Sequence, residues 1–364
     1  MALSPDKPEQ TRRIIDASLD RIGEGLRLLE DIARFVLDDA GLSRRLKELR
    51  HDLAVTDIPL KESLVQARKS AADIGADIEA PQQKAARDLP SLVVANSRRV
   101  QEALRVIEEL AKLPASGLET AKYRQARFKI YGLEKELLSR LLRRDKAERI
   151  NGLYGIVDTD SLGRRNHLEA AEAFIEGGAK VIQLRDKTSS HRRLFSIAAE
   201  LKELCAKSNA IFIVNDYLDI ALAVDADGLH IGQEDLPPAE ARRLLPIDKL
   251  LGVSVTDTAE AREAGAAGAD YLAAGAIYKT ASKDDIRVIG LEELKRIRMA
   301  TRLPLVAIGG IDKNNCAAVL EAGADALAVI SAVLSAANQQ QAAREIISTI
   351  KGCRKASRAR ANLN

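Results

Sequence analysis

The pattern of hydrophobic and polar positions along the chain changes near Asn151. From about Thr11 to Lys146, apolar residues recur at every third or fourth position, which predicts amphipathic helices rather than strands. After Asn151, short runs rich in β-branched residues alternate with amphipathic helical segments, a pattern typical of βα units around a parallel sheet. Because the chain has 364 residues, we expect the two patterns to correspond to two domains.

Eight apolar runs in the second part predict strands. They are continuous rather than alternating, as expected of strands that are buried on both faces of a sheet. Eight βα units in about 200 residues predict an α/β fold, the (β/α)8 TIM barrel, preceded here by a mainly α-helical domain. The fourth run has the weakest pattern. The predicted strands are 153–157, 180–184, 210–214, 228–231, 250–253, 271–274, 305–308 and 326–330.

The helical part contains an internal duplication. Residues 17–33 and 95–111 both read A-x-x-x-R-x-x-E-x-L-R-x-x-E-x-x-A, at a spacing of 78 residues. In each copy the apolar residues recur at helical spacing and predict one buried stripe. The stripe contains Ile22, Leu26 and Leu29 in the first copy and Val100, Leu104 and Ile107 in the second.

The charged residues of the duplication also superpose, and their spacing of three places them near one face of each helix. Two interpretations remain open: a solvated ladder of ion pairs, or a set of Arg and Glu side chains that line a polar site across a pseudo-twofold axis. Shorter basic segments follow each copy. The residues are Arg21, Glu24, Arg27, Glu30, Lys47, Arg50 and His51 in the first half, and Arg99, Glu102, Arg105, Glu108, Arg124 and Arg127 in the second.

The composition, with 46% hydrophobic and 30% charged residues, is typical of a globular protein. A net charge of +3 and an aromatic content of 3% give no indication of nucleic-acid binding, since single-strand binding uses aromatic stacking. No run of about 18 apolar residues predicts a membrane span. We expect a cytoplasmic protein because the first residues lack the apolar segment of a signal peptide and the three cysteines are too far apart for a zinc or disulfide framework.

The domain boundaries are predicted from charge. The charged stretch Arg140–Arg149 is expected to be the linker, which gives a helical domain at 1–148 and a barrel at 149–351. Residues 352–364 form a basic tail. We interpret this tail as a frayed, solubilising terminus rather than a site for an anionic partner.

Polar residues follow the predicted strands, at the face where TIM barrels carry their chemistry. Asp216 and Asp235 leave adjacent strands, so they could share one Mg²⁺, which is commonly held by one or two carboxylates and by substrate phosphates. The side chains of Arg185, Lys187 and Lys283 supply donors for a diphosphate. The backbone amides at Gly309–Gly310 can approach an oxyanion, since the loops after strands seven and eight commonly bind phosphate. Together they predict a site for two phosphorylated ligands and a metal.

Each of these residues also has a simpler interpretation. Asp216 precedes a helix, where an Asp most often serves as a cap. The Gly309–Gly310 pair could form an ordinary turn, and His230 on a short strand is expected in the core rather than as a ligand. The functional interpretation rests on all of them following strands in order.

On these motifs the segment 152–335 resembles thiamine-phosphate synthase throughout its length. The motifs occur in the order QLRDK, VND, GLHIGQEDLP, LGVSV, YLAAGAIYKTASK, AIGGI and AVISAV. The resemblance implies a transferase that joins hydroxymethylpyrimidine diphosphate to hydroxyethylthiazole phosphate and releases pyrophosphate. It also implies that departure of the diphosphate can precede attack by the thiazole nitrogen, so that no protein nucleophile is needed.

The resemblance also implies roles for individual residues. Mg²⁺ would be bound by Asp216 and Asp235, and Lys283, Arg185 and Ser254 would act in catalysis. One departure is that Ser282 stands where the family commonly has Thr, and it keeps the hydroxyl group. The pyrimidine diphosphate would contact Gln183, Leu184, Arg185, Asp186, Lys187, Asn215, Ser254 and Lys283, and the thiazole phosphate would contact Thr280, Ala281, Ser282, Gly310, Ile330 and Ser331.

The helical part resembles the domain found ahead of some thiamine-phosphate synthases. That resemblance implies phosphorylation of hydroxymethylpyrimidine phosphate with ATP, and hence a multifunctional enzyme. The sequence has no G-x-x-x-x-G-K-[ST] loop, so dimerisation or scaffolding remains the alternative, and a homo-oligomer is possible. For the barrel, the alternatives are a thiazole tautomerase and a non-catalytic sensor of thiamine precursors.

Overall fold

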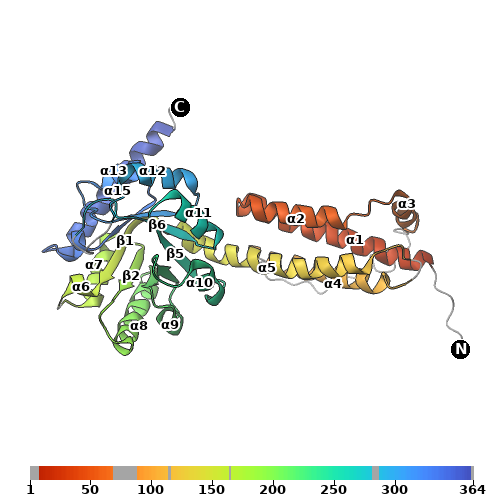
Figure 1. Ribbon diagram of the computed structural model, residues 1–364, viewed down its shortest axis with the longest axis horizontal. Helices are drawn as coiled ribbons and strands as arrows, with labels where there is room; N and C mark the ends of the chain where they lie inside the picture. Colours follow the sequence, from red (N-terminus) through yellow and green to blue (C-terminus); the bar gives the residue numbers. More distant parts are fainter. Residues whose placement is uncertain (1–7, 69–87, 114–115, 164, 281–286, 362–364) are drawn as a thin grey trace. The chain divides into compact units, whose positions relative to one another are not determined.

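The computed structural model describes residues 8–68, 88–113, 116–163, 165–280 and 287–361. Compact packing divides the chain into two units, Met1–Leu142 and Arg143–Asn364. The first unit is helical throughout its described residues, and the second is an α/β barrel, as the hydrophobic pattern predicted (Figure 1).

The duplicated sequence forms two long helices that pack against each other in the helical unit. The buried stripe is confirmed, since all six of its predicted residues are at most 1% exposed. The helices approach closely at Gly25, where a Cβ atom would lie 2.5 Å from Cγ2 of Val100. The elements of this unit are α1 (Pro8–Asp31), a π-helix η1 (Ile32–Val36), α2 (Ala40–Leu53), α3 (Ile58–Gln66), α4 (Leu89–Leu110) and α5 (Thr120–Glu148).

The charged stretch that we expected to join the two domains contains the division between the units, which falls after Leu142, and it is helical. It forms the C-terminal part of α5, which continues across the division between the units. No Gly or Pro interrupts this stretch, and ion pairs one turn apart stabilise it, including Arg144 Nε to Glu148 Oε1 at 2.7 Å. The last residues of α5 belong to the barrel, where Arg143 Nε donates to Asp270 Oδ1 at 2.7 Å.

The second unit is a closed barrel in which each strand pairs in parallel with the next and the eighth pairs with the first. The eight predicted strands are confirmed, including the weak fourth one, with ends that shift by one or two residues. The strands are β1 (Gly152–Asp158), β2 (Val181–Arg185), β3 (Ile211–Asn215), β4 (Gly228–Ile231), β5 (Leu250–Val255), β6 (Tyr271–Gly275), β7 (Leu305–Ile308) and β8 (Ala326–Val329).

Two apolar layers hold the barrel together. One fills its interior with side chains that include Ile156, Ile213 and Val306, and the other packs the strands against the surrounding helices (Figure 1). The helices are α6 (Thr159–Leu162), α7 (His167–Gly177), α8 (His191–Lys207), α9 (Leu218–Ala223), α10 (Pro238–Leu244), α11 (Thr258–Ala266), α12 (Gly290–Ala300), α13 (Cys316–Glu321), α14 (Ser331–Leu334) and α15 (Gln339–Ala361).

Residues 352–361 of the segment expected to be a frayed tail are part of helix α15, and residues 362–364 lie outside the described residues. Arg354 ties this helix to the barrel, because its guanidinium donates to the backbone oxygen of Asp325 at 2.7 Å and to Asn151 Oδ1 at 3.4 Å. A search of the described residues finds no helix that is long and apolar enough to span a membrane.

Candidate functional site

Two amides follow neighbouring strands at the C-terminal end of the barrel. Gln183 lies near the end of β2, and Asn215 is the last residue of β3. Gln183 Nε2 donates to Asn215 Oδ1 at 2.9 Å. Because Gln183 is only 4% exposed, this contact fixes the amide orientation and leaves the Asn215 amide nitrogen available to a ligand acceptor.

Arg185 is held by a carboxylate that the sequence analysis did not identify. Asp158 ends β1, pairs in register with Arg185 and is 2% exposed. Its Oδ2 accepts a hydrogen bond from Arg185 Nη1, and its Oδ1 accepts from the backbone nitrogen of Ser161 at 2.9 Å. The rule used for the other strands, that a polar residue at a strand end is a candidate, also applies to Asp158.

The next two predicted residues serve the structure of the loop and core. Asp186 Oδ1 accepts from the backbone nitrogens of Thr188 at 3.0 Å and Ser189 at 2.8 Å. Burial by itself raises the pKa of Asp186, but these hydrogen bonds outweigh it and the pKa is lowered. The Leu184 side chain is 1% exposed and packs in the layer between strands and helices.

Asp216 and Asp235 come together, and we call them the carboxylate pair. Burial and then the neighbouring Asp235 carboxylate raise the pKa of Asp216 to about 6. Lys187 Nζ lies 3.4 Å from Asp216 Oδ2 and opposes that shift. Asp235 Oδ2 accepts from the backbone nitrogen of Gly232 at 2.7 Å, which orients it. Asp216 does not cap a helix, because the N-cap position of α9 is Tyr217 and no side chain caps that helix.

The carboxylate pair fits Mg²⁺. Two carboxylates this close repel each other unless a proton or a cation lies between them, and this repulsion adds to the effect of burial in raising the pKa of Asp216. The donors are oxygens, and Mg²⁺ is typically held by one or two carboxylates with substrate phosphates completing its shell. Among the described residues, no cluster of three or more His, Cys, Asp or Glu is arranged to hold a metal, so a ligand would have to supply the remaining donors.

Ser254 lies near the end of β5 and is held from two sides. His230 Nε2 contacts Ser254 Oγ at 3.0 Å, and Gln233 Nε2 donates to the Ser254 backbone oxygen at 2.5 Å. His230 is 7% exposed, as expected for a core residue. Its other ring nitrogen, Nδ1, contacts the Tyr271 hydroxyl at 3.1 Å. The sequence interpretation of His230 as a core residue missed its contact with Ser254.

The loops after β7 and β8 bring backbone close to the barrel end. Gly310 has φ +65°, and a Cβ there would lie 2.6 Å from the backbone oxygen of Lys279, so only glycine fits. Ile330 follows β8 and is half-buried, and Ser331 is the exposed first residue of α14. Thr280 ends the described segment after β6. Ala281, Ser282 and Lys283 lie outside the described residues.

In the helical unit, the last Glu of each repeat forms a buried ion pair. Glu30 Oε2 accepts from Arg50 Nε at 3.0 Å, and Glu108 Oε2 accepts from Arg127 Nε at 3.1 Å. Both glutamates are 5% exposed. The Arg50 and Arg127 segments that follow each repeat are therefore structural partners of the repeat. The other charged residues of the motif, Arg21, Glu24, Arg27, Arg99, Glu102 and Arg105, are exposed.

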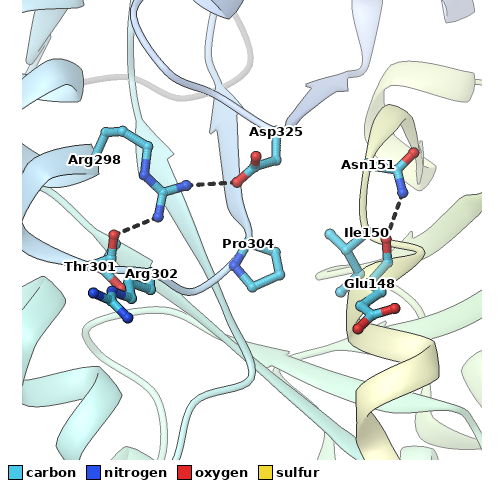
Figure 2. Close-up of a pocket in the computed structure, with 8 residues that line it drawn as sticks. All are labelled: Glu148, Ile150, Asn151, Arg298, Thr301, Arg302, Pro304 and Asp325. Atoms are coloured by element: carbon cyan, nitrogen blue, oxygen red, sulfur yellow. Dashed lines mark hydrogen bonds and ion pairs between the residues drawn. The ribbon is translucent and has the colours of Figure 1, made fainter. Parts of the chain in front are cut away.

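A cavity of about 450 Å³ lies at the opposite end of the barrel, before strands β7, β8 and β1 (Figure 2). Arg298 crosses it to Asp325 Oδ2 at 2.7 Å, and Asn151 Nδ2 donates to the backbone oxygen of Glu148 at 2.6 Å. In TIM barrels this end serves stability, and none of the predicted site residues lines the cavity. Its lining residues are Glu148, Ile150, Asn151, Arg298, Thr301, Arg302, Pro304 and Asp325.

Known proteins share both units of this chain. A family profile described as thiamine monophosphate synthase matches residues 153–333, and a profile of the ThiD2 family matches residues 13–136. A thiamine-phosphate synthase of Synechocystis is 39% identical over 346 residues, which cover 94% of this chain and 97% of that protein. One of Thermosynechococcus vestitus is 40% identical over 340 residues, which cover 93% of this chain and 95% of that protein.

A solved structure agrees with these sequence relatives. The thiamine phosphate pyrophosphorylase of Pyrococcus furiosus superposes with a TM-score of 0.53 at 40% identity, covering 57% of this chain and 98% of that one. The resemblance inferred from the strand-end motifs is thus confirmed. This chain belongs to the thiamine-phosphate synthase family.

Proposed function

We propose that the barrel catalyses the reaction for which its relatives are named, formation of thiamine phosphate, as a transferase that acts on hydroxymethylpyrimidine diphosphate and hydroxyethylthiazole phosphate. The observation that carries this proposal is the carboxylate pair, with Lys187 beside Asp216 at 3.4 Å. A thiazole tautomerase would transfer no diphosphate, so a cation site beside a lysine favours diphosphate chemistry over that alternative.

The described residues support binding and orientation rather than nucleophilic attack. Arg185, held by Asp158, presents its remaining guanidinium donors to an anion. Gln183 and Asn215 form a fixed amide pair that can orient the pyrimidine. The carboxylate pair would hold Mg²⁺, which when bound supplies charge neutralisation for a departing pyrophosphate. Departure of that group leaves a cation that the aminopyrimidine delocalises, and the thiazole nitrogen forms the new C–N bond.

Gly310 and the loop after β8 supply the second phosphate site of the proposal. Gly310 itself carries no side chain. Asn315 Nδ2 donates to the Gly310 backbone oxygen at 2.8 Å, which holds the loop in place. A phosphate at this position would accept from backbone N–H groups. The thiazole phosphate would bind here, with its ring nitrogen toward the amide pair.

The test is to incubate the purified full chain with both substrates and Mg²⁺ and to measure thiamine phosphate and pyrophosphate. We expect equal amounts of the two products, and loss of both with EDTA. Asp235→Asn should lower turnover at least tenfold, whereas Asp219→Asn, on the exposed surface of α9, should not. A folded protein that binds both ligands without forming product would overturn the proposal and favour the sensor.

For the helical unit we propose phosphorylation of hydroxymethylpyrimidine phosphate, with dimerisation or scaffolding as the alternative. Support comes from the match to the ThiD2 family over residues 13–136 and from the exposed charges of both repeats. The test replaces the diphosphate by the monophosphate and ATP in the same assay. Product that disappears in an Arg21→Ala/Arg99→Ala variant would support the proposal, and absence of product from the unaltered chain would overturn it.

A further inference from the structure

A chain of hydrogen bonds crosses the interior of the barrel and ends at Ser254. The Tyr154 hydroxyl of β1 lies 2.9 Å from the Tyr271 hydroxyl of β6. The Tyr271 hydroxyl lies 3.1 Å from His230 Nδ1 of β4, and His230 Nε2 lies 3.0 Å from Ser254 Oγ of β5. We call these four residues the Ser254 network. Three of them are core residues, with Tyr154 at 2%, Tyr271 at 0% and His230 at 7% exposure.

The neighbouring backbone makes room for this network. A Cβ at Gly252 would lie 2.1 Å from Tyr271 Cζ and 2.5 Å from His230 Nδ1, so no larger residue fits there. The His230 and Tyr271 rings stack with centroids 5.6 Å apart. The glycine lets the two rings meet inside the barrel, and the ring contact fixes which edge of His230 faces Ser254.

The two tyrosines are protonated. Burial is the main cause that raises the pKa of both Tyr154 and Tyr271 above the ordinary value. Each hydroxyl therefore has one hydrogen to donate at neutral pH.

The far end of the network sets its direction. Within the part of the chain that the structure describes, the hydrogen-bond partner of the Tyr154 hydroxyl is Tyr271 alone. If Tyr271 donated to Tyr154, the Tyr154 hydrogen would be buried without an acceptor, which is unfavourable. Tyr154 therefore donates to Tyr271, and Tyr271 donates to His230 Nδ1. The His230 proton then resides on Nε2 and is donated to Ser254 Oγ.

We infer that the tyrosine pair and His230 position Ser254 as a hydrogen-bond donor toward an acceptor atom of the pyrimidine diphosphate. Ser254 Oγ receives the Nε2 proton of His230 on a lone pair, so its own hydrogen points away from the ring and can be given to the ligand. Phosphate oxygens and pyrimidine ring nitrogens are such acceptors. The inference rests on the proposed function, because that proposal assigns Ser254 to the substrate.

The protonation of His230 can be observed directly by ¹⁵N NMR of histidine-labelled full-length protein. The chain has four histidines, and the His230 signals can be assigned by their absence from His230→Gln. We expect a bare Nδ1 and a protonated Nε2 at neutral pH. A proton on Nδ1 would overturn the inference. This measurement uses the unaltered protein, so it does not depend on how well a variant folds.

Kinetics test whether the network acts through Ser254. The Tyr154→Phe/Tyr271→Phe variant removes both hydroxyls together, so that no buried tyrosine hydroxyl is left without its partner. His230 can then take either tautomer, and Ser254 can donate to it instead of to the substrate. We expect KM for the pyrimidine diphosphate to rise about tenfold, the effect of one hydrogen bond to a charged group, with kcat changed far less. Tyr123→Phe, which removes the hydroxyl of a buried tyrosine in the helical unit, should leave KM unchanged.

The same pair of substitutions should have no further effect in a Ser254→Ala protein, because contacts that act through one residue are not additive. Equal losses in both backgrounds would mean that the tyrosines only stabilise the barrel and would overturn the inference. If Ser254→Ala itself leaves KM unchanged, the assignment of Ser254 to the substrate fails. That outcome is distinguishable from a failure of the network, which the tautomer of His230 reports.

Discussion

The carboxylate pair predicts that cation binding depends on the protonation of Asp216. Burial and the Asp235 carboxylate raise the pKa of Asp216 to about 6. Below that pH the cation must displace a proton from Asp216, so affinity falls as the pH is lowered through 6. The Asp216→Asn substitution removes both this proton and one oxygen ligand, and it keeps the size of the side chain.

The size of the effect follows from that pKa. At pH 7 a group that titrates near pH 6 is almost fully ionised, and at pH 5 almost fully protonated, so the apparent dissociation constant should rise about tenfold between these values. This corresponds to about 1.4 kcal/mol. In Asp216→Asn the affinity should be weaker at pH 7 and nearly independent of pH over the same interval. Asp219→Asn, a change of an exposed carboxylate three positions along the chain, should keep the pH dependence of the unaltered protein.

Binding of Mn²⁺, a paramagnetic substitute for Mg²⁺, measures this affinity by electron paramagnetic resonance of the free ion. Titrations at pH 5, 6 and 7 without substrate avoid the titration of the diphosphate itself. The reasoning would be refuted if the unaltered protein bound Mn²⁺ equally well at pH 5 and pH 7. It would also be refuted if Asp216→Asn kept the full pH dependence.

Three further substitutions test the packing. Gly252→Ala would force a methyl group against Tyr271, so we expect it to destabilise the barrel by about 1–3 kcal/mol in thermal denaturation, and a variant of unchanged melting temperature would contradict the close approach. Asp270→Asn leaves the buried guanidinium of Arg143 without its carboxylate, so the free energy of unfolding in urea should fall by about 3–5 kcal/mol. A fall of less than about 1 kcal/mol, as for an exposed ion pair, would contradict this prediction. Glu108→Gln should destabilise the helical unit by about 1–3 kcal/mol as followed by circular dichroism, and a neutral result would mean that the repeat's last carboxylate is not structural.

Much of the fold could be predicted because its signals are local. The eight strands were identified from short apolar runs, and helices α1 and α4 from the spacing of residues such as Ile22 and Leu26. The stretch 140–149 contains the division between the two units, as expected, but its helical form could not be predicted because charge alone does not distinguish a solvated loop from a helix. Ion pairs one turn apart, such as Arg144 with Glu148, stabilise the helical form.

The candidate residues of the site could also be predicted, since polar residues at the ends of parallel strands gather at one end of a barrel. Their partners could not. Asp158 and Arg185 are separated by 27 positions, and nothing near either one indicates the other. Ala281, Ser282 and Lys283 lie outside the described residues, so their roles stay predictions.

The sequence by itself therefore determined the barrel, the duplicated helices and the chemical types of side chain at the strand ends, because periodicity and strand order are properties of neighbouring residues. Only the tertiary structure decided which groups meet. Closure of the sheet brings Tyr154 to Tyr271 across 117 positions. It also places Asp216 against Asp235, where burial and mutual repulsion change the protonation of a carboxylate. Those effects depend on distance and on exclusion of water, which are set by the folded chain.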